Sequence, residues 1–283
     1  MSNIILIDSS YTSFHRFFAT MRWFSLAHMD TYKKYKDDIT YDWSQQPEFI
    51  EKYKKMYLES IINLISKNVY MDSIVIFCLD SPQVTLWRHE FSDCYKGNRI
   101  DMSKKTNFIP TFKYTYNTLI PGLVRNNSNF HMICIPKMEA DDLIALSVRF
   151  IKYKRPSKYI YIVSGDNDFL QLGFDKLYFA DYKKIAAHPQ VFQLTKEEAR
   201  NALHMKIING DCSDNIPSIF PKDEKISNKL KKLIKEDKNE LRKYLSNNQK
   251  AMNQYTHNKK LISFKYIPKN LRKPIYSIIK SIL

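Results

Sequence analysis

Glycine is scarce in this chain, with five residues among 283, while Lys, Ile, Asn and Tyr are abundant, as an A/T-rich genome would encode. The four cysteines include no C-x-x-C pair and the seven histidines no metal-ligand spacing, which argues against a zinc or dithiol redox site. We expect free thiols and a reducing compartment. No apolar run approaches the ~18 residues that span a bilayer, and the N-terminus lacks a basic leader segment. We therefore expect an intracellular protein without a membrane anchor.

Acidic residues are also in the minority, at 29 against 45 Lys and Arg, which gives a net charge of +16. The excess is local, because residues 222–283 hold 17 basic and 5 acidic residues. Such a patch favours a polyanionic partner, most often nucleic acid, although a solvated Lys-rich helical surface would have the same composition. Apolar residues make up 44% of the chain, enough for one large ordered domain or a domain with a packed extension.

Short apolar runs alternate with helical patterns along the first two thirds of the chain. We expect buried strands at 3–7, 73–79, 130–135 and 159–164, and helices at 48–65, 84–96, 111–125 and 139–152. Strands separated by helical crossovers predict an α/β fold, with a twisted, mostly parallel sheet flanked by helices. We divide the chain into an α/β core, 1–195, and a basic helical region packed on it, 196–283.

Carboxylates follow every one of these predicted strands. They are Asp8, Asp80, Glu139, Asp141, Asp142, Asp166 and Asp168, and Asp211 and Asp214 open the basic region. Any one group has an ordinary explanation as a turn or helix-cap residue. In an open parallel sheet, however, the carboxyl ends of the strands share one edge, so the groups should converge. Clustered carboxylates repel unless cations neutralise them, and hard divalent cations prefer oxygen ligands. The pattern predicts two-metal phosphodiester hydrolysis on a basic protein.

Six short segments, in the same order, resemble the 5′-nuclease superfamily of flap endonucleases and 5′→3′ exonucleases. They are IDSSY (7–11), FCLDSP (77–82), YKGNR (95–99), EADD (139–142), SGDNDFLQL (164–172) and GDCSDNIP (210–217). Within the superfamily the chain is most similar to the ribonuclease H type of T-even phages, through WRHEF (87–91) and NKKLISFKYIP (258–268).

The resemblance implies a helical arch over the active site, at about 84–128, and a helical DNA-binding region. It implies two Mg²⁺ ions, with Mn²⁺ as a substitute. Asp8, Asp80, Glu139, Asp141 and Asp142 match the first metal group, and Asp166, Asp168, Asp211 and Asp214 match the second. Lys96 and Arg99, with Arg88 earlier on the predicted helix, match the basic face of the arch, which would contact the scissile phosphate.

The implied substrates are branched or nicked duplex DNA and RNA–DNA primer hybrids, cut at 5′ flaps or ends during replication, repair or recombination. Candidate protein partners are a sliding clamp and a single-strand binding protein, and we expect a monomer at sites of replication, in the host cytoplasm or nucleus if the chain is viral. The expected DNA contacts are Lys33, Lys34, Lys222, Lys225, Lys229, Lys231 and Lys232. The Gly-rich hairpin of many members is missing after residue 217, which leaves a monovalent-ion site open.

Two alternatives remain at this point. An RNA-cleaving endonuclease on the same scaffold would use the same carboxylates. A non-catalytic DNA-structure-binding protein is a weaker alternative, because every matched metal position still carries a carboxylate.

Overall fold

The computed structural model describes residues 2–81, 86–97, 107–183, 189–220 and 226–283. Arg99, Lys222 and Lys225 lie outside these residues. The described part contains a six-stranded sheet in the order β3-β2-β1-β4-β5-β6. The strands are β1 (Asn3–Asp8), β2 (Ser73–Cys78), β3 (Phe130–Ile133), β4 (Tyr159–Val163), β5 (Leu177–Ala180) and β6 (Val191–Gln193). All neighbours are parallel except β6, which runs antiparallel to β5. The predicted α/β fold and its four strands are confirmed, and the short strands β5 and β6 were missed.

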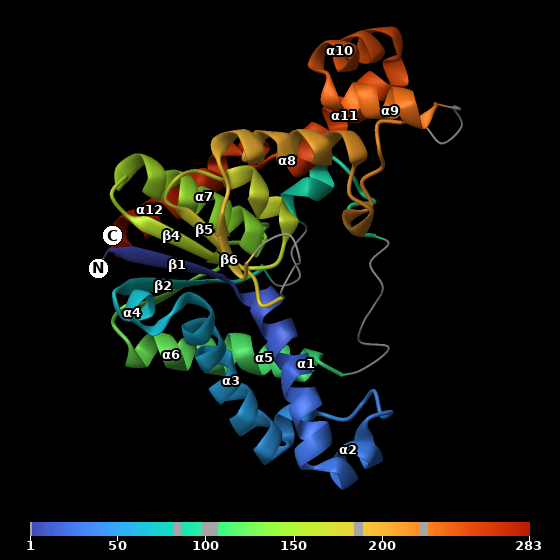
Figure 1. Ribbon diagram of the computed structural model, residues 1–283. Coiled ribbons are helices and arrows are strands. Elements are labelled where there is room, and N and C mark those ends of the chain that lie inside the picture. The colour runs from blue at the N-terminus through green and yellow to red at the C-terminus, as the bar shows by residue number, and fades with distance from the viewer. Residues whose placement is uncertain (1, 82–85, 98–106, 184–188, 221–225) are drawn as a thin grey trace.

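The sheet is covered by helices on both faces, because its central strands are apolar on both sides (Figure 1). All six residues of β1 are buried. One face packs against α7 (Ala140–Lys154) and α12 (Lys269–Ile282). The other packs against α1 (Ser9–Ala27), α3 (Pro47–Ile65) and α6 (Ile120–Asn126). Short α4 (Lys67–Met71) leads from α3 into β2, and α5 (Ile109–Tyr114) continues through a π-helical turn into α6.

The predicted helix at 84–96 is wrong in its described part, 86–96. The structure has a single 3₁₀ turn at Trp87–Glu90, followed by irregular backbone in which Lys96 has φ +58°. Trp87 and Arg88 are both buried, and their side chains bond to Asp142 of α7. These tertiary bonds outweigh the local helical pattern. The other predicted helices are confirmed within a few residues.

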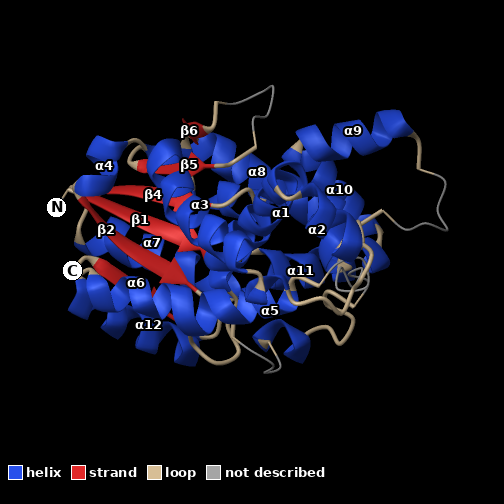
Figure 2. Ribbon diagram, turned by 90° about the horizontal axis from the view of Figure 1, so that it is seen from below, coloured by secondary structure: helices blue, strands red, loops and turns tan. Residues whose placement is uncertain are grey.

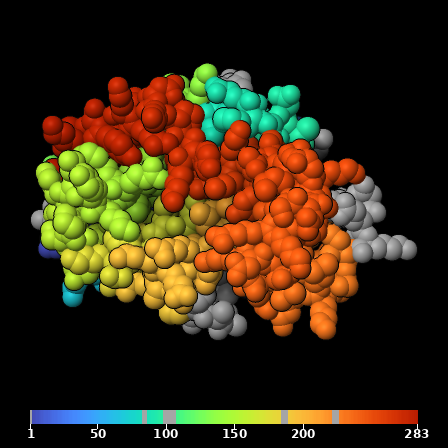
Figure 3. Space-filling model, turned by 90° about the horizontal axis from the view of Figure 1, so that it is seen from above, coloured from blue at the N-terminus to red at the C-terminus, as the bar shows by residue number. Residues whose placement is uncertain are grey.

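The last third of the described chain is helical and has two parts: a lobe with its own apolar cluster, and a final helix that packs on the core. Helices α8 (Lys196–Asn209), α9 (Asn228–Glu236), α10 (Lys238–Asn247) and α11 (Gln249–Ile262) lead into a lobe with its own apolar cluster around Ile234 and Leu241. Helix α12 then returns to α7, and Figure 3 shows it (red) beside the orange lobe on the upper face. No described helix combines the length and the apolar character that crossing a membrane requires.

The strands point their carboxyl ends toward the middle of the molecule, as Figure 2 shows. From this edge α1 and α2 (Met29–Tyr35) project to one side and the α8–α11 lobe projects to the other (Figure 1). The carboxyl edge of the sheet therefore lies between two helical arms.

Helix α12 belongs to the central core, and a pair of substitutions tests this. Ile279 is fully buried in the cluster that contains Ile4, Leu6 and Ile162 of the sheet. We expect Ile279→Ala to lower the free energy of unfolding by ~2–5 kcal/mol, measured by urea denaturation. Exposed Lys280 is the matched control, and Lys280→Ala should change it by less than about 0.5 kcal/mol. Equal effects of the two substitutions would contradict the assignment.

Candidate active site

A cleft of about 1250 Å³ lies at the carboxyl edge of the sheet. Its carboxylates come from five separate chain segments that the fold brings together, and they are Asp8, Asp80, Glu139, Asp141, Asp166 and Asp211. Three lysines also line it, Lys96, Lys183 and Lys206. The convergence expected from the sequence therefore appears in the structure, although the role of each residue stays a prediction.

Asp8 occupies the junction of β1 and α1. Its carboxylate caps α1 by accepting the backbone N–H of Tyr11 at 3.0 Å, and it also accepts the Ser164 hydroxyl at 2.8 Å. Burial, and then the neighbouring Asp80 carboxylate, raise the pKa of Asp8 to about 7. Asp8 thus has the hydrogen bonds of an ordinary helix cap, but it is also buried beside a second carboxylate, which helix capping does not require.

Asp80 joins β2 to the start of α7. It accepts the backbone N–H of Ala140 at 2.7 Å, and the Ser10 hydroxyl bonds to its other oxygen. Burial, and then Asp166 and Asp8, raise the pKa of Asp141 well above its ordinary value. Burial also raises the pKa of Asp166, against the opposing charge of Lys206. These four carboxylates therefore repel one another at the bottom of the cleft.

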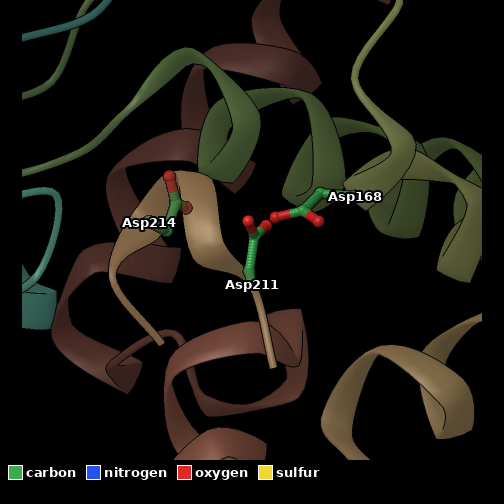
Figure 4. Close-up of side chains that lie close together, drawn as sticks. All are labelled: Asp168, Asp211 and Asp214. Atoms are coloured by element: carbon green, nitrogen blue, oxygen red, sulfur yellow. The ribbon is translucent and has the colours of Figure 1, made fainter. Parts of the chain in front are cut away.

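A second carboxylate group lies beside the first. One oxygen each from Asp168, Asp211 and Asp214 lie within 4.8 Å of one another (Figure 4). Lys206, on the last turn of α8, contacts Asp168 and lies 2.7 Å from Asp211. Sequence reasoning missed Lys206, since nothing in the local pattern distinguishes it from the other helical lysines.

The loop 210–217 folds locally as its sequence requires. Gly210 has φ +71°, and a Cβ there would come within 2.3 Å of the Ile216 carbonyl oxygen. Asp211 and Ile216 exchange two backbone hydrogen bonds of 2.8 Å, and Asp211 caps the 3₁₀ turn Cys212–Asp214. The turn places Asp211 and Asp214 toward Asp168.

Tyr95 and Lys96 connect the two carboxylate groups. The Tyr95 hydroxyl lies 3.1 Å from a carboxylate oxygen of Glu139 and 3.1 Å from one of Asp214. The Lys96 backbone N–H donates to the Asp214 carbonyl at 2.9 Å, and its ammonium group contacts Glu139. Burial raises the pKa of Glu139, but Arg88 and then Lys96 hold it below its ordinary value. Lys96 therefore lies at the cleft, where the sequence placed it, but on irregular backbone.

Arg88 lies elsewhere than predicted. It is 4% exposed, does not line the cleft and does not share a basic helical face with Lys96. Its guanidinium bonds to Glu139 at 2.9 Å, to Asp142 at 2.8 Å and to the Leu261 carbonyl at 3.0 Å. Asp142 is fully buried and also accepts the Trp87 indole N–H at 2.8 Å. We correct both assignments: Arg88 and Asp142 support Glu139 from behind, and neither reaches the cleft.

The expected DNA-contacting lysines lie outside the cleft. Lys33 and Lys34 are on α2, at the end of one arm. Lys229, Lys231 and Lys232 are on α9, in the lobe of the other arm. The sequence reasoning missed a different set of cations, which lines the cleft itself: Arg16, Arg22 and Lys183.

The donor set of the cleft fits hard divalent cations, because carboxylate oxygens from two adjacent groups are its metal-binding atoms. Asp8, Asp80, Glu139 and Asp141 would hold one ion. Asp168, Asp211 and Asp214 would hold another, with Asp166 between the groups.

Comparisons with known proteins agree with this geometry. Residues 3–201 match the family model described as 5′-3′ exonuclease, N-terminal resolvase-like domain. The chain is 24% identical over 220 residues to ribonuclease H of Enterobacteria phage T4, which covers 73% of this chain and 70% of that protein.

Solved structures share the fold. The T5 D15 protein, co-crystallized with metal ions, superposes with a TM-score of 0.62 at 17% identity and covers 99% of both chains. The bacteriophage T5 D15 flap endonuclease, in a pseudo-enzyme–product complex with DNA and metal ions, has a TM-score of 0.62 at 16% identity, covering 99% of this chain and 98% of that one.

We expect the buried ion pairs of Arg88 to stabilise the folded protein. Arg88→Met leaves Glu139 and Asp142 buried without their partner, so the free energy of unfolding at neutral pH should fall by ~3–5 kcal/mol. Guanidinium denaturation followed by circular dichroism measures this change. The control is Arg155→Met, at an exposed position at the end of α7, and a similar small loss in both variants would contradict the role of Arg88.

Because its pKa is raised, Asp8 should make the stability of the folded protein depend on pH. Between its ordinary value of 3.8 and about 7 the folded protein holds a proton that the unfolded chain has lost. The contribution of Asp8 to stability therefore falls as pH rises through this window. In EDTA, the wild type should lose more unfolding free energy between pH 5 and pH 8 than Asp8→Asn does. Asp175→Asn, at an exposed site, should behave like the wild type, and parallel curves for all three would refute the prediction.

Proposed function

Because the chain belongs to the 5′-3′ exonuclease family and is a hydrolytic nuclease, we propose that it is a Mg²⁺-dependent, structure-selective 5′-nuclease. Its proposed substrates are 5′ flaps, nicked duplex DNA and the RNA of RNA–DNA primer hybrids. The proposal rests on one observation: two groups of carboxylates lie side by side at a single cleft, between two helical arms that carry lysines.

The carboxylate groups support the use of two divalent ions, Mg²⁺ with Mn²⁺ as a substitute. When bound in such a pair, the ions activate water and stabilise the leaving oxygen of a phosphodiester. The chain's own residues hold the site in shape. Arg88 fixes Glu139, Asp8 and Asp80 are fixed by caps to α1 and α7, and no side-chain nucleophile is required.

Lys96 is the cation best placed to contact the reacting phosphate. It lines the cleft beside Glu139, and its side chain reaches the carboxylates from irregular backbone tied to Asp214. A positive charge at that position would offset charge that develops on the phosphate oxygens during cleavage. Arg99, three residues later, keeps its proposed role in the same contact.

The two arms support binding of a branched substrate. Lys229, Lys231 and Lys232 on α9 would contact phosphates of one duplex, and Lys33 and Lys34 on α2 would contact the other side of the branch. Such contacts orient the substrate without reading its sequence. Lys222 and Lys225 remain proposed contacts. Whether the lobe holds a monovalent ion stays open, since it lacks the Gly-rich hairpin.

The proposed setting is DNA replication, repair or recombination inside a cell, in viral replication by analogy with the phage relative. A monomer is proposed, with a sliding clamp and a single-strand binding protein as candidate partners.

Cleavage of a 5′-labelled flap on nicked duplex DNA tests the proposal. The wild type should cut at the flap junction in Mg²⁺ and not in EDTA. Asp80→Ala should be slower by about 10²-fold or more while still binding the flap, because it loses a metal ligand and no proposed DNA contact. Asp175→Ala serves as the matched control and should cut like the wild type.

Three outcomes would count against the proposal. Undiminished cutting by Asp80→Ala would refute the metal assignment. Flap binding without cutting, together with cleavage of single-stranded RNA, would instead establish the RNA endonuclease. Binding that is equal in EDTA and Mg²⁺, with no product from DNA or RNA, would establish a non-catalytic DNA-binding protein.

A further inference from the structure

A cluster of cations lines the cleft on α1 and after β5, and the metal chemistry does not use it. The cluster consists of Arg16 and Lys183, with the His15 imidazole beside them, and all three line the same cleft as the carboxylates. The Arg16 Nη2 atom lies 3.2 Å from His15 Nδ1. Burial, and then Arg16 and Lys183, lower the pKa of His15, which favours its neutral form, so the positive charge here belongs to Arg16 and Lys183.

Arg16 has no carboxylate partner among the described residues, where no ion pair includes it. Its Nε atom is buried and makes no hydrogen bond to any described residue. A half-buried guanidinium in this condition is costly, because water is removed and no anion replaces it. Such a group is suited to receive an anion from outside the protein.

The guanidinium of Arg16 is held by an aromatic ring. It lies 4.2 Å from the centre of the Tyr182 ring, which itself stacks on Tyr11. Asp181 is the nearby carboxylate, and it is already bonded to the Tyr11 hydroxyl and, at 2.9 Å, to the Lys183 backbone N–H. Arg16 is therefore fixed in place by stacking and by the contact of its Nη2 atom with His15, and no described carboxylate neutralises its charge.

Tyr11 and Asp181, which lie beside the cluster, pack against Gly165 at the edge of the sheet that carries the carboxylates. A Cβ on Gly165 would lie 2.7 Å from the Tyr11 hydroxyl and 2.9 Å from an Asp181 oxygen. Gly165 immediately precedes Asp166, so its lack of a Cβ leaves room for the Tyr11 and Asp181 side chains beside the carboxylates. An anion held by Arg16 would thus lie within the same cleft as a phosphate at the metal ions, but at a separate point.

We propose that Arg16 and Lys183 bind a second phosphate of the nucleic-acid strand, near the one that is cut. The inference rests on the proposed function. A planar guanidinium beside an ammonium group matches the oxygen atoms of a phosphate, and the regular spacing of phosphates along a strand would then set which bond reaches the carboxylates. The cluster is thereby a positioning site for the strand.

The salt dependence of binding tests the proposal without any cleavage. The Kd of a fluorescent 5′-flap DNA is measured in EDTA at several salt concentrations. Loss of one phosphate contact lowers the slope of log K against log salt by about 0.7–0.9. Arg16→Gln and, separately, Lys183→Gln should show this decrease and weaken binding on the order of tenfold. Arg16→Lys, which keeps the charge, should retain most of the slope.

Arg155→Gln is the matched control, because Arg155 is exposed and lies between the end of α7 and the start of β4, at the edge of the sheet opposite the cleft. It should keep the wild-type slope. Lys183 is exposed, so Lys183→Gln gives a result even if Arg16→Gln fails to fold. Wild-type slopes in both variants would overturn the inference and leave the proposed function intact. Failure of the wild type to bind nucleic acid would overturn both.

Flaps ending in a 5′-phosphate or a 5′-hydroxyl distinguish two sources of the bound group. An effect of Arg16→Gln that is confined to the 5′-phosphate would assign the site to the strand terminus. An equal effect on both would assign it to an internal phosphodiester.

Discussion

Repulsion among carboxylates is the constraint on which the rest of this structure depends. Asp8, Asp80, Asp141 and Asp166 come from separate elements, and burial together with the neighbouring carboxylates raises the pKa of Asp8 and Asp141. A fold does not gain stability from such an arrangement. The surrounding protein compensates for part of it through Lys206, Lys96 and the buried guanidinium of Arg88. The arrangement is explained by divalent cations and a phosphodiester substrate, for which closely spaced oxygen ligands are required.

The parallel sheet is what brings these acids together, and two glycines let the remaining parts close around them. Parallel strands place their carboxyl ends at one edge, so one acid after each strand is enough to build a site. Gly165 allows the Tyr11–Asp181 contact to pack against Asp166, and Gly210 allows the tight turn that carries Asp211 and Asp214. Of the five glycines in the chain, Gly210 is required by its positive φ, and Gly165 leaves room for side chains that border the site.

Much of this could be predicted from the sequence, and the failures have physical reasons. Four apolar runs predicted strands β1 to β4, and the carboxylates that follow these runs predicted the cleft, because both signals are local. Strands β5 and β6, four and three residues long, were both missed. Arg88 was placed on a helix, since its spacing from Lys96 is helical, but its buried bonds to Glu139 and Asp142 join residues 51 and 54 positions apart. Lys206 and Arg16 acquire their roles only through tertiary neighbours.

If divalent cations neutralise carboxylates that otherwise retain protons near neutral pH, binding of the ions must release protons. Calorimetric titration of the wild type with Mg²⁺, repeated in buffers of different ionisation enthalpy, measures the protons released per ion bound. We expect Mg²⁺ to bind with proton release at pH 6.5, and with a smaller release at pH 8.5, above the pKa of about 7 for Asp8. Binding with no proton release at either pH, or no Mg²⁺ binding at all, would contradict this role of the cations.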